Sequence, residues 1–76
     1  MKLRFLKTIS VDVEKPHSLE VWAKTINKWD EIRVNAVFDT AGGFATIETY
    51  DGEFLLNVPK NAFEPVKEEK RTLASL

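Results

Sequence analysis

Few residues in this chain could do catalytic chemistry, and their types exclude most active sites. The 76 residues include one histidine and no cysteine. Neither a histidine-based triad nor a thiol nucleophile with several partners can therefore assemble within one copy. His17 follows Pro16 in an expected loop, where a lone imidazole is most often simply solvated. We therefore expect no catalytic residues, and the sequence predicts a protein that is not an enzyme.

Metal and phosphate sites have equally little support. Asp51 and Glu53 flank a glycine at an expected turn, where carboxylates ordinarily serve solubility. The Gly42-Gly43 pair lacks the spacing and the following lysine of a phosphate-binding loop. We therefore expect no metal and no cofactor.

The aromatic side chains are better candidates for a binding site. Four of them are predicted to form a contact surface for a protein or peptide: Trp22, Trp29, Phe44 and Tyr50. If Val21 points inward, Trp22 points outward, and an outward aromatic patch usually marks a contact surface. The alternative is that both tryptophans seal the open end of a small barrel.

Basic residues define a second candidate surface, for nucleic acid: Lys2, Arg4, Lys24, Lys28 and Arg33. Residues 1–33 carry seven Lys and Arg against five Asp and Glu, whereas residues 34–66 carry one against five. Small barrels can stack bases on aromatic rings beside a basic groove. The net charge of −1 makes this the alternative to protein binding.

A period-two alternation of apolar and polar residues runs through residues 2–14. One face collects the apolar members: Leu3, Phe5, Ile9, Val11 and Val13. This pattern indicates a half-buried strand, or two strands joined by a bend near Lys7. Pro16 then breaks the pattern.

Residues 19–33 allow two interpretations. At helical spacing, with Ser18 as N-cap, an apolar stripe forms from Leu19, Trp22, Ala23, Ile26 and Trp29. As a hairpin, residues 19–23 and 29–34 form the strands, and Asn27 lies in the turn between them. The hairpin is favoured because asparagine tolerates the left-handed conformation that turns often need.

Residues 44–66 carry the strongest fold signal. Asp51-Gly52 between two apolar runs predicts a hairpin with a type I′ turn, in which both central residues have positive φ. Pro59 ends the second strand because it cannot donate to a ladder. The expected elements are strands over residues 44–50 and 53–58, a 3₁₀ turn over 61–63 and a last strand over 64–66.

The ending NVPKNAFEPV resembles the close of SH3 domains, in which a strand, a 3₁₀ turn and a valine-containing strand complete a small barrel. Pro59, Asn61, Phe63 and Val66 stand in the matching order, with Phe63 where the family usually has tyrosine. The front of the chain lacks the ALYDY-type string and the Trp-Trp pair, so the resemblance implies no groove for proline-rich peptides. It implies an all-β fold: a small SH3-like barrel of five or six antiparallel strands with a 3₁₀ turn before the last strand.

This barrel is expected to occupy residues 1–66, followed by a frayed or weakly helical tail over residues 67–76. The N-terminus begins with basic residues, but Arg4 and Lys7 interrupt any apolar segment, and no apolar run approaches the ~18 residues of a membrane span. We therefore expect a cytoplasmic protein with no membrane contact.

SH3-like barrels serve chromatin readers, RNA-binding and ribosomal modules, and small phage or plasmid proteins, so the shape alone does not specify a function. We expect a non-enzymatic interaction module that binds an unidentified protein or peptide, or a second copy of itself, through the aromatic surface. The alternative is a nucleic-acid-binding or transcription-regulating barrel encoded by a mobile element.

Overall fold

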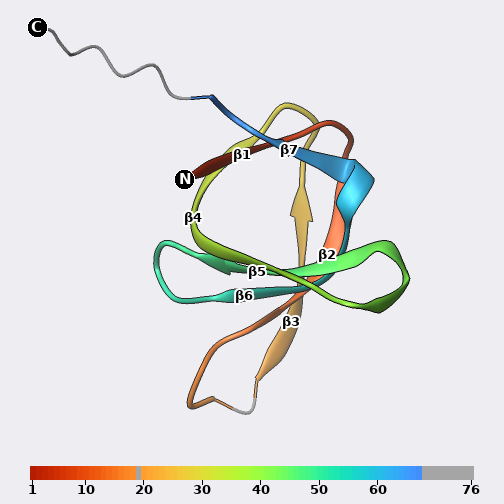
Figure 1. Ribbon diagram of the computed structural model, residues 1–76. Helices are drawn as coiled ribbons and strands as arrows, with labels where there is room; N and C mark the ends of the chain where they lie inside the picture. The colour runs from red at the N-terminus through yellow and green to blue at the C-terminus, as the bar shows by residue number, and fades with distance from the viewer. Residues whose placement is uncertain (19, 68–76) are drawn as a thin grey trace, which may run out of the picture.

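The computed structural model describes residues 1–18 and 20–67, which form seven antiparallel strands in one open sheet with two 3₁₀ turns (Figure 1). The elements are β1 (Lys2–Phe5), β2 (Ile9–Glu14), β3 (Val21–Ile26), β4 (Glu31–Asp39), η1 (Ala41–Gly43), β5 (Phe44–Thr49), β6 (Phe54–Pro59), η2 (Lys60–Ala62) and β7 (Phe63–Pro65). The sheet order is β3-β2-β6-β5-β4-β1-β7. The all-β, antiparallel prediction is confirmed, but the expected count of five or six strands is wrong.

The sheet curls strongly without closing. Its terminal strands are β3 and β7, and no ladder joins these two in the described part of the chain. Two irregularities sharpen the curl. The register of the β4–β5 ladder shifts between Val34 and Ala36 of β4. The register of the β5–β6 ladder shifts between Ala45 and Ile47 of β5, and Asn57 of β6 has φ 52° at this irregularity. Such bulges bend the strand and increase its twist.

The alternating segment at the start folds as two strands, as the bend expected near Lys7 implied. β1 pairs with β4 and β7, whereas β2 pairs with β3 and β6. The bend is held by the backbone N–H of Leu6, which donates to Ala62 O at 2.8 Å. The predicted inward face is confirmed, because Phe5 and Val13 are completely buried.

The prediction for residues 19–33 is only half right. The helical alternative is wrong, and strands form at β3 and β4, but these two strands do not pair with each other. β3 instead pairs with β2 along its whole length, from Ile9 opposite Ile26 to Glu14 opposite Val21. The turn that joins them contains His17 at φ 65°, so the break at Pro16 is itself the hairpin turn.

The hairpin of β5 and β6 is confirmed, although its turn differs from the prediction. Gly52 has φ 92°, but Asp51 has no positive φ, so the turn is not type I′. The backbone N–H of Gly52 donates to Thr49 O at 3.1 Å, and the backbone N–H of Thr49 donates to Glu53 O at 2.8 Å. One left-handed glycine after the turn is the arrangement of a three-residue hairpin loop.

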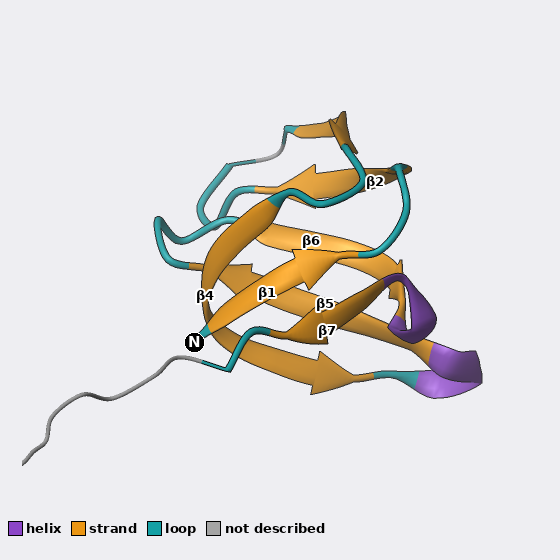
Figure 2. Ribbon diagram, turned by 90° about the horizontal axis from the view of Figure 1, so that it is seen from above, coloured by secondary structure: helices purple, strands orange, loops and turns teal. Residues whose placement is uncertain are grey.

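The closing segment follows the predicted order with a shift of one residue. β6 ends at Pro59, the 3₁₀ turn η2 runs over Lys60–Ala62 rather than 61–63, and β7 begins at Phe63. The two 3₁₀ turns lie side by side at one end of the sheet (Figure 2). Lys60 Nζ lies 3.7 Å from Asp39 Oδ2 across this end.

The core fills the inside of the curled sheet. Its buried cluster consists of Leu3, Phe5, Val11, Val13, Ile26, Val34, Ile47, Leu55 and Val58. Phe63 packs against this cluster, with its ring centroid 5.8 Å from that of Phe5. The last strand therefore stabilises the first through side chains as well as through the ladder.

Most of the predicted tail, residues 68–76, lies outside the described residues. Within residues 1–18 and 20–67, no helix has the length and apolar character needed to cross a membrane. The same part of the chain contains no group of three His, Asp or Glu side chains placed to hold a metal ion.

Candidate functional site

A buried threonine organises the turn between β5 and β6. Thr49 is only 5% exposed, and its hydroxyl donates to Asp51 Oδ1 while accepting the backbone N–H of Glu53 at 3.0 Å. The backbone hydrogen bonds of Thr49 to Gly52 and Glu53 close the same turn. Tyr50 follows Thr49 and is 68% exposed. A rigid turn therefore presents an aromatic ring to solvent.

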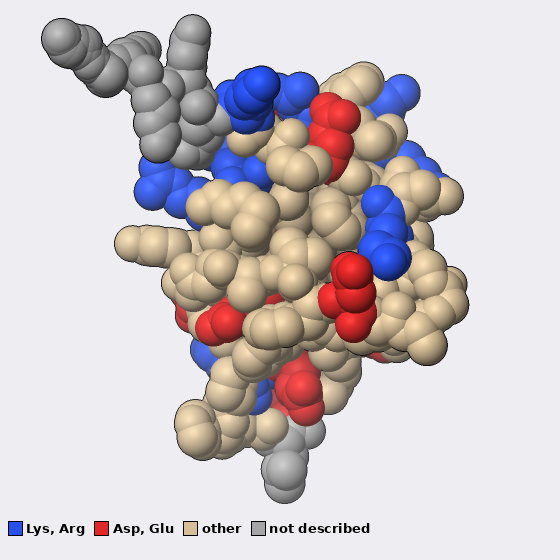
Figure 3. All heavy atoms as spheres, viewed as in Figure 1, with Lys and Arg blue, Asp and Glu red and all other residues tan. Residues whose placement is uncertain are grey.

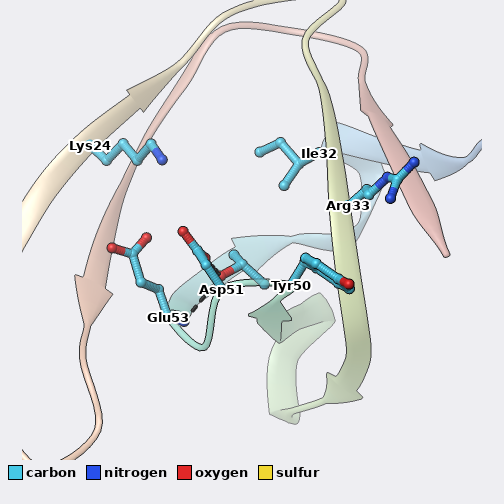
Figure 4. Close-up of a pocket in the computed structure, with 7 residues that line it drawn as sticks. Lys24, Ile32, Arg33, Tyr50, Asp51 and Glu53 are labelled. Carbon is cyan, nitrogen blue, oxygen red and sulfur yellow. Dashed lines mark hydrogen bonds between the residues drawn. The ribbon is translucent and has the colours of Figure 1, made fainter.

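This turn forms one wall of a pocket of about 260 Å³. The lining residues come from β3, β4 and the turn: Lys24, Ile32, Arg33, Thr49, Tyr50, Asp51 and Glu53. Figure 4 shows Lys24 and Ile32 pointing toward each other across the gap between β3 and β4. The pocket lies where β3 and β4 face each other with no ladder between them among the described residues.

A second pocket adjoins the first and shares two of its walls. It is lined by Met1, Arg33, Val34, Asn35 and Tyr50, also with a volume of about 260 Å³. Tyr50 and Arg33 stand between the two pockets, and the backbone N–H of Tyr50 donates to Arg33 O at 3.0 Å. We refer to the two pockets together as the Tyr50 groove.

Charges of both signs lie in the Tyr50 groove. The carboxylates of Asp51 and Glu53 lie below Lys24, whereas the guanidinium of Arg33 points to the far side of β4 (Figure 4). The hydrogen bond from Thr49 lowers the pKa of Asp51 below its ordinary value, and the positive charges of Lys24 and Lys15 add to the effect. The groove therefore offers an anionic edge at neutral pH.

Trp22 lies beside this groove. The assumption that Val21 points inward and Trp22 outward was wrong. Trp22 is opposite the buried Val13 in the ladder, so it shares the inner face of β3, whereas Val21 is 55% exposed. Along the strand, Trp22 and Lys24 are successive residues of that face, about 7 Å apart. Trp22 remains 37% exposed, so it only partly covers the core.

Trp29 lies elsewhere, in the turn between β3 and β4 at the far end of β3. It is 61% exposed and has φ 75°, a conformation that bulky residues rarely adopt. Lys28 Nζ lies 5.1 Å from the centroid of its ring. The structure therefore separates Trp29 from Tyr50, and the four predicted aromatics do not form one platform.

Phe44 occupies a third location, on the outer face of the sheet. It is 40% exposed, and its ring lies close to Gly42 of η1. Phe38, which is 49% exposed, is opposite Thr46 and therefore a diagonal neighbour of Phe44. This outer pair lies at the start of β5, whereas Tyr50 follows the last residue of the strand, so the two sites are at opposite ends of β5.

Two of the five basic residues predicted for nucleic acid, Lys2 and Arg4, form ion pairs, and Lys28 lies over the ring of Trp29. Lys2 Nζ lies 3.7 Å from Glu31 Oε1, and Arg4 Nη2 lies 3.1 Å from Glu31 Oε2. Arg4 Nη1 also lies 3.6 Å from Glu64 Oε2. Lys24 and Arg33 both line the first pocket, together with the carboxylates of Asp51 and Glu53. On the face seen in Figure 3, acidic side chains interrupt the basic ones.

Several groove residues were missed by sequence reasoning. The sequence pattern assigns Asp51 and Glu53 to turn solubility and does not single out Thr49. The available signal was a polar residue in phase with the buried Ala45 and Ile47, directly before an exposed aromatic. No protein-family model, curated protein or solved structure matches this chain.

Proposed function

We propose that the protein is a non-enzymatic interaction module that binds a peptide segment of a partner protein in the Tyr50 groove. The observation that carries this proposal is Tyr50 itself, an aromatic side chain 68% exposed on a turn held by the hydrogen bonds of Thr49. A preorganised aromatic wall binds without the entropic cost of ordering a loop. Tyrosine also supplies both apolar contact area and a hydroxyl.

The size of the pockets supports a side chain as the ligand rather than a cofactor. Each has about 260 Å³, below the roughly 300–1,000 Å³ typical of small-molecule sites. Two adjoining pockets separated by Tyr50 suit two side chains of one extended segment. Ile32 favours an apolar side chain in the first pocket, and Asp51 and Glu53 favour a basic residue beside it.

We also propose that the open sheet belongs to the SH3-like class. The support is the order of its last elements, in which a strand ending at Pro59 is followed by a 3₁₀ turn and a short strand against β1. The front of the chain lacks the residues of the proline-rich-peptide groove, so the proposed binding site does not derive from that family.

Nucleic-acid binding is less well supported. Phosphate recognition needs clustered Lys and Arg, whereas Lys2 and Arg4 share carboxylate partners and Lys24 faces Asp51 and Glu53. Binding of a short single-stranded oligonucleotide at low salt, lost steeply as salt rises, would favour that alternative.

Panning of a random peptide library on the immobilised protein tests the proposal. Enriched peptides should bind Tyr50→Ala at least about tenfold more weakly, which corresponds to ~1.4 kcal/mol. Trp29→Ala is the matched control, because it removes an equally exposed aromatic outside the groove. Both variants should keep a native circular dichroism spectrum. Equal weakening by the two substitutions, or none by Tyr50→Ala, would refute the assignment of the site.

A further inference from the structure

The first strand of the sheet order has an unused edge. β3 is hydrogen-bonded to β2 on one side, and no other strand of the described chain pairs with it. Five of its six residues are exposed, and only Ile26 is buried. Its sequence VWAKTI is rich in residues that favour strands and carries a single charge. An edge of this kind is a template for pairing with another strand.

We propose that β3 pairs antiparallel with β3 of a second copy, so that two sheets join into one across a twofold axis. This inference concerns the edge of β3 and does not rest on peptide binding in the Tyr50 groove, with which β3 shares Lys24. The net charge of −1 gives little repulsion between copies. The remaining question is whether the strand is complementary to itself in a definite register.

Twofold symmetry limits the registers severely. Residues directly opposite each other in an antiparallel pair point to the same face of the sheet. In a pair of identical strands, each residue is therefore opposite one that lies an even number of positions away in the sequence. The twofold axis must then pass between two copies of the same residue. Two positions of the axis pair five residues of β3 with the same five residues of the second copy. These positions are Ala23, which pairs residues 21–25, and Lys24, which pairs residues 22–26. A centre on Lys24 places two ammonium groups directly opposite, which is unfavourable.

The centre on Ala23 gives complementary neighbours. It places Trp22 opposite Lys24 of the second copy, and Lys24 opposite the second copy's Trp22, on the inner face. On the outer face it places Val21 opposite Thr25. Cross-strand side chains at this separation are within reach of a cation–π contact between lysine and tryptophan. Trp22, 37% exposed in one copy, would thereby gain a partner.

A single engineered cysteine reports this register directly, because the chain contains no cysteine. Ala23→Cys lies on the proposed axis, so its two copies face each other at a distance that a disulfide spans. Thr25→Cys is the matched control on the same face of β3. Its two copies lie four residues apart along the paired strands, about 13 Å, which is too far for a disulfide.

In a glutathione redox buffer, we expect Ala23→Cys to form a covalent dimer far more readily than Thr25→Cys. We also expect the unmodified protein to show a concentration-dependent monomer–dimer equilibrium by sedimentation. Ala23→Asp should raise the dissociation constant of the dimer by about tenfold or more, because it opposes two carboxylates. Ala41→Asp, at an exposed position of η1, is the control and should leave the equilibrium unchanged.

The proposal is overturned by either of two results. One is a monomer at all concentrations with equal crosslinking of the two cysteine variants. The other is a dimer that Ala23→Asp and Ala41→Asp affect equally. The two proposals can fail independently. Tyr50→Ala tests peptide binding and leaves the β3 edge intact, whereas Ala23→Asp tests the dimer and leaves the lining of the groove intact.

Discussion

The hydroxyl of Thr49 serves two neighbours at once, donating to the carboxylate of Asp51 and accepting the backbone N–H of Glu53. A valine has the same shape but can do neither. The turn that carries Tyr50 thus depends on one oxygen atom at a position that is otherwise part of the core. This makes Thr49 a positioning residue for the groove.

We predict that Thr49→Val lowers the free energy of unfolding at neutral pH by about 1–2 kcal/mol, because a part-buried N–H loses its acceptor. Urea unfolding measures the change. Because the turn loosens, the same variant should weaken binding of peptides selected on the groove. Unchanged stability together with unchanged binding would contradict the role of the hydroxyl.

The pH dependence of this variant has a definite sign. The pKa of Asp51 is lowered in the folded protein, chiefly by the hydrogen bond from Thr49. Its ionised form therefore adds stability above the unfolded pKa of about 3.9, and this contribution disappears as the pH falls through the folded pKa. The stability difference between wild type and Thr49→Val should accordingly narrow below about pH 4. A difference that is constant with pH would show that Asp51 is not coupled to Thr49.

At the scale of elements, the parts that local sequence determines were predicted, and the parts that depend on distant pairing were not. The β5–β6 hairpin and the break at Pro59 follow from turn residues and alternation within a few positions. The pairing partner of β3 cannot be predicted in this way. β2 and β4 both neighbour β3 in the sequence, and the choice between them depends on contacts across the whole sheet. The orientation of Trp22 was wrong for the same reason, since it depended on an assumed direction for Val21.

Bulges were also beyond prediction, because the residue that adopts the unusual conformation has no distinctive neighbour. Asn57 lies in β6 at φ 52°, a conformation that asparagine tolerates and β-branched residues do not. We predict that Asn57→Val lowers the free energy of unfolding by about 1–2 kcal/mol, whereas Asn57→Gly leaves it unchanged or raises it. Thermal or urea unfolding of the two variants compares them. Equal stability of the two would show that no left-handed residue is needed at this bulge.

At the scale of the whole molecule, the open sheet leaves two surfaces for which we propose binding. The gap between β3 and β4 holds the first pocket of the Tyr50 groove, and the free edge of β3 offers backbone hydrogen bonds. Trp22 and Lys24 lie on the inner face of β3 between these two surfaces. The proposed peptide and the proposed second copy would both contact Lys24, which lines the first pocket and belongs to β3.

The location of the bound peptide is the most direct test of the central claim. Amide and side-chain NMR shifts of the labelled protein should be recorded during titration with a peptide selected on it. We predict the largest changes at Tyr50, Arg33 and Lys24, and small changes at Phe38 and Trp29. Changes centred instead on the outer pair of Phe38 and Phe44, or on the Trp29 turn, would contradict the assignment of the Tyr50 groove as the binding site.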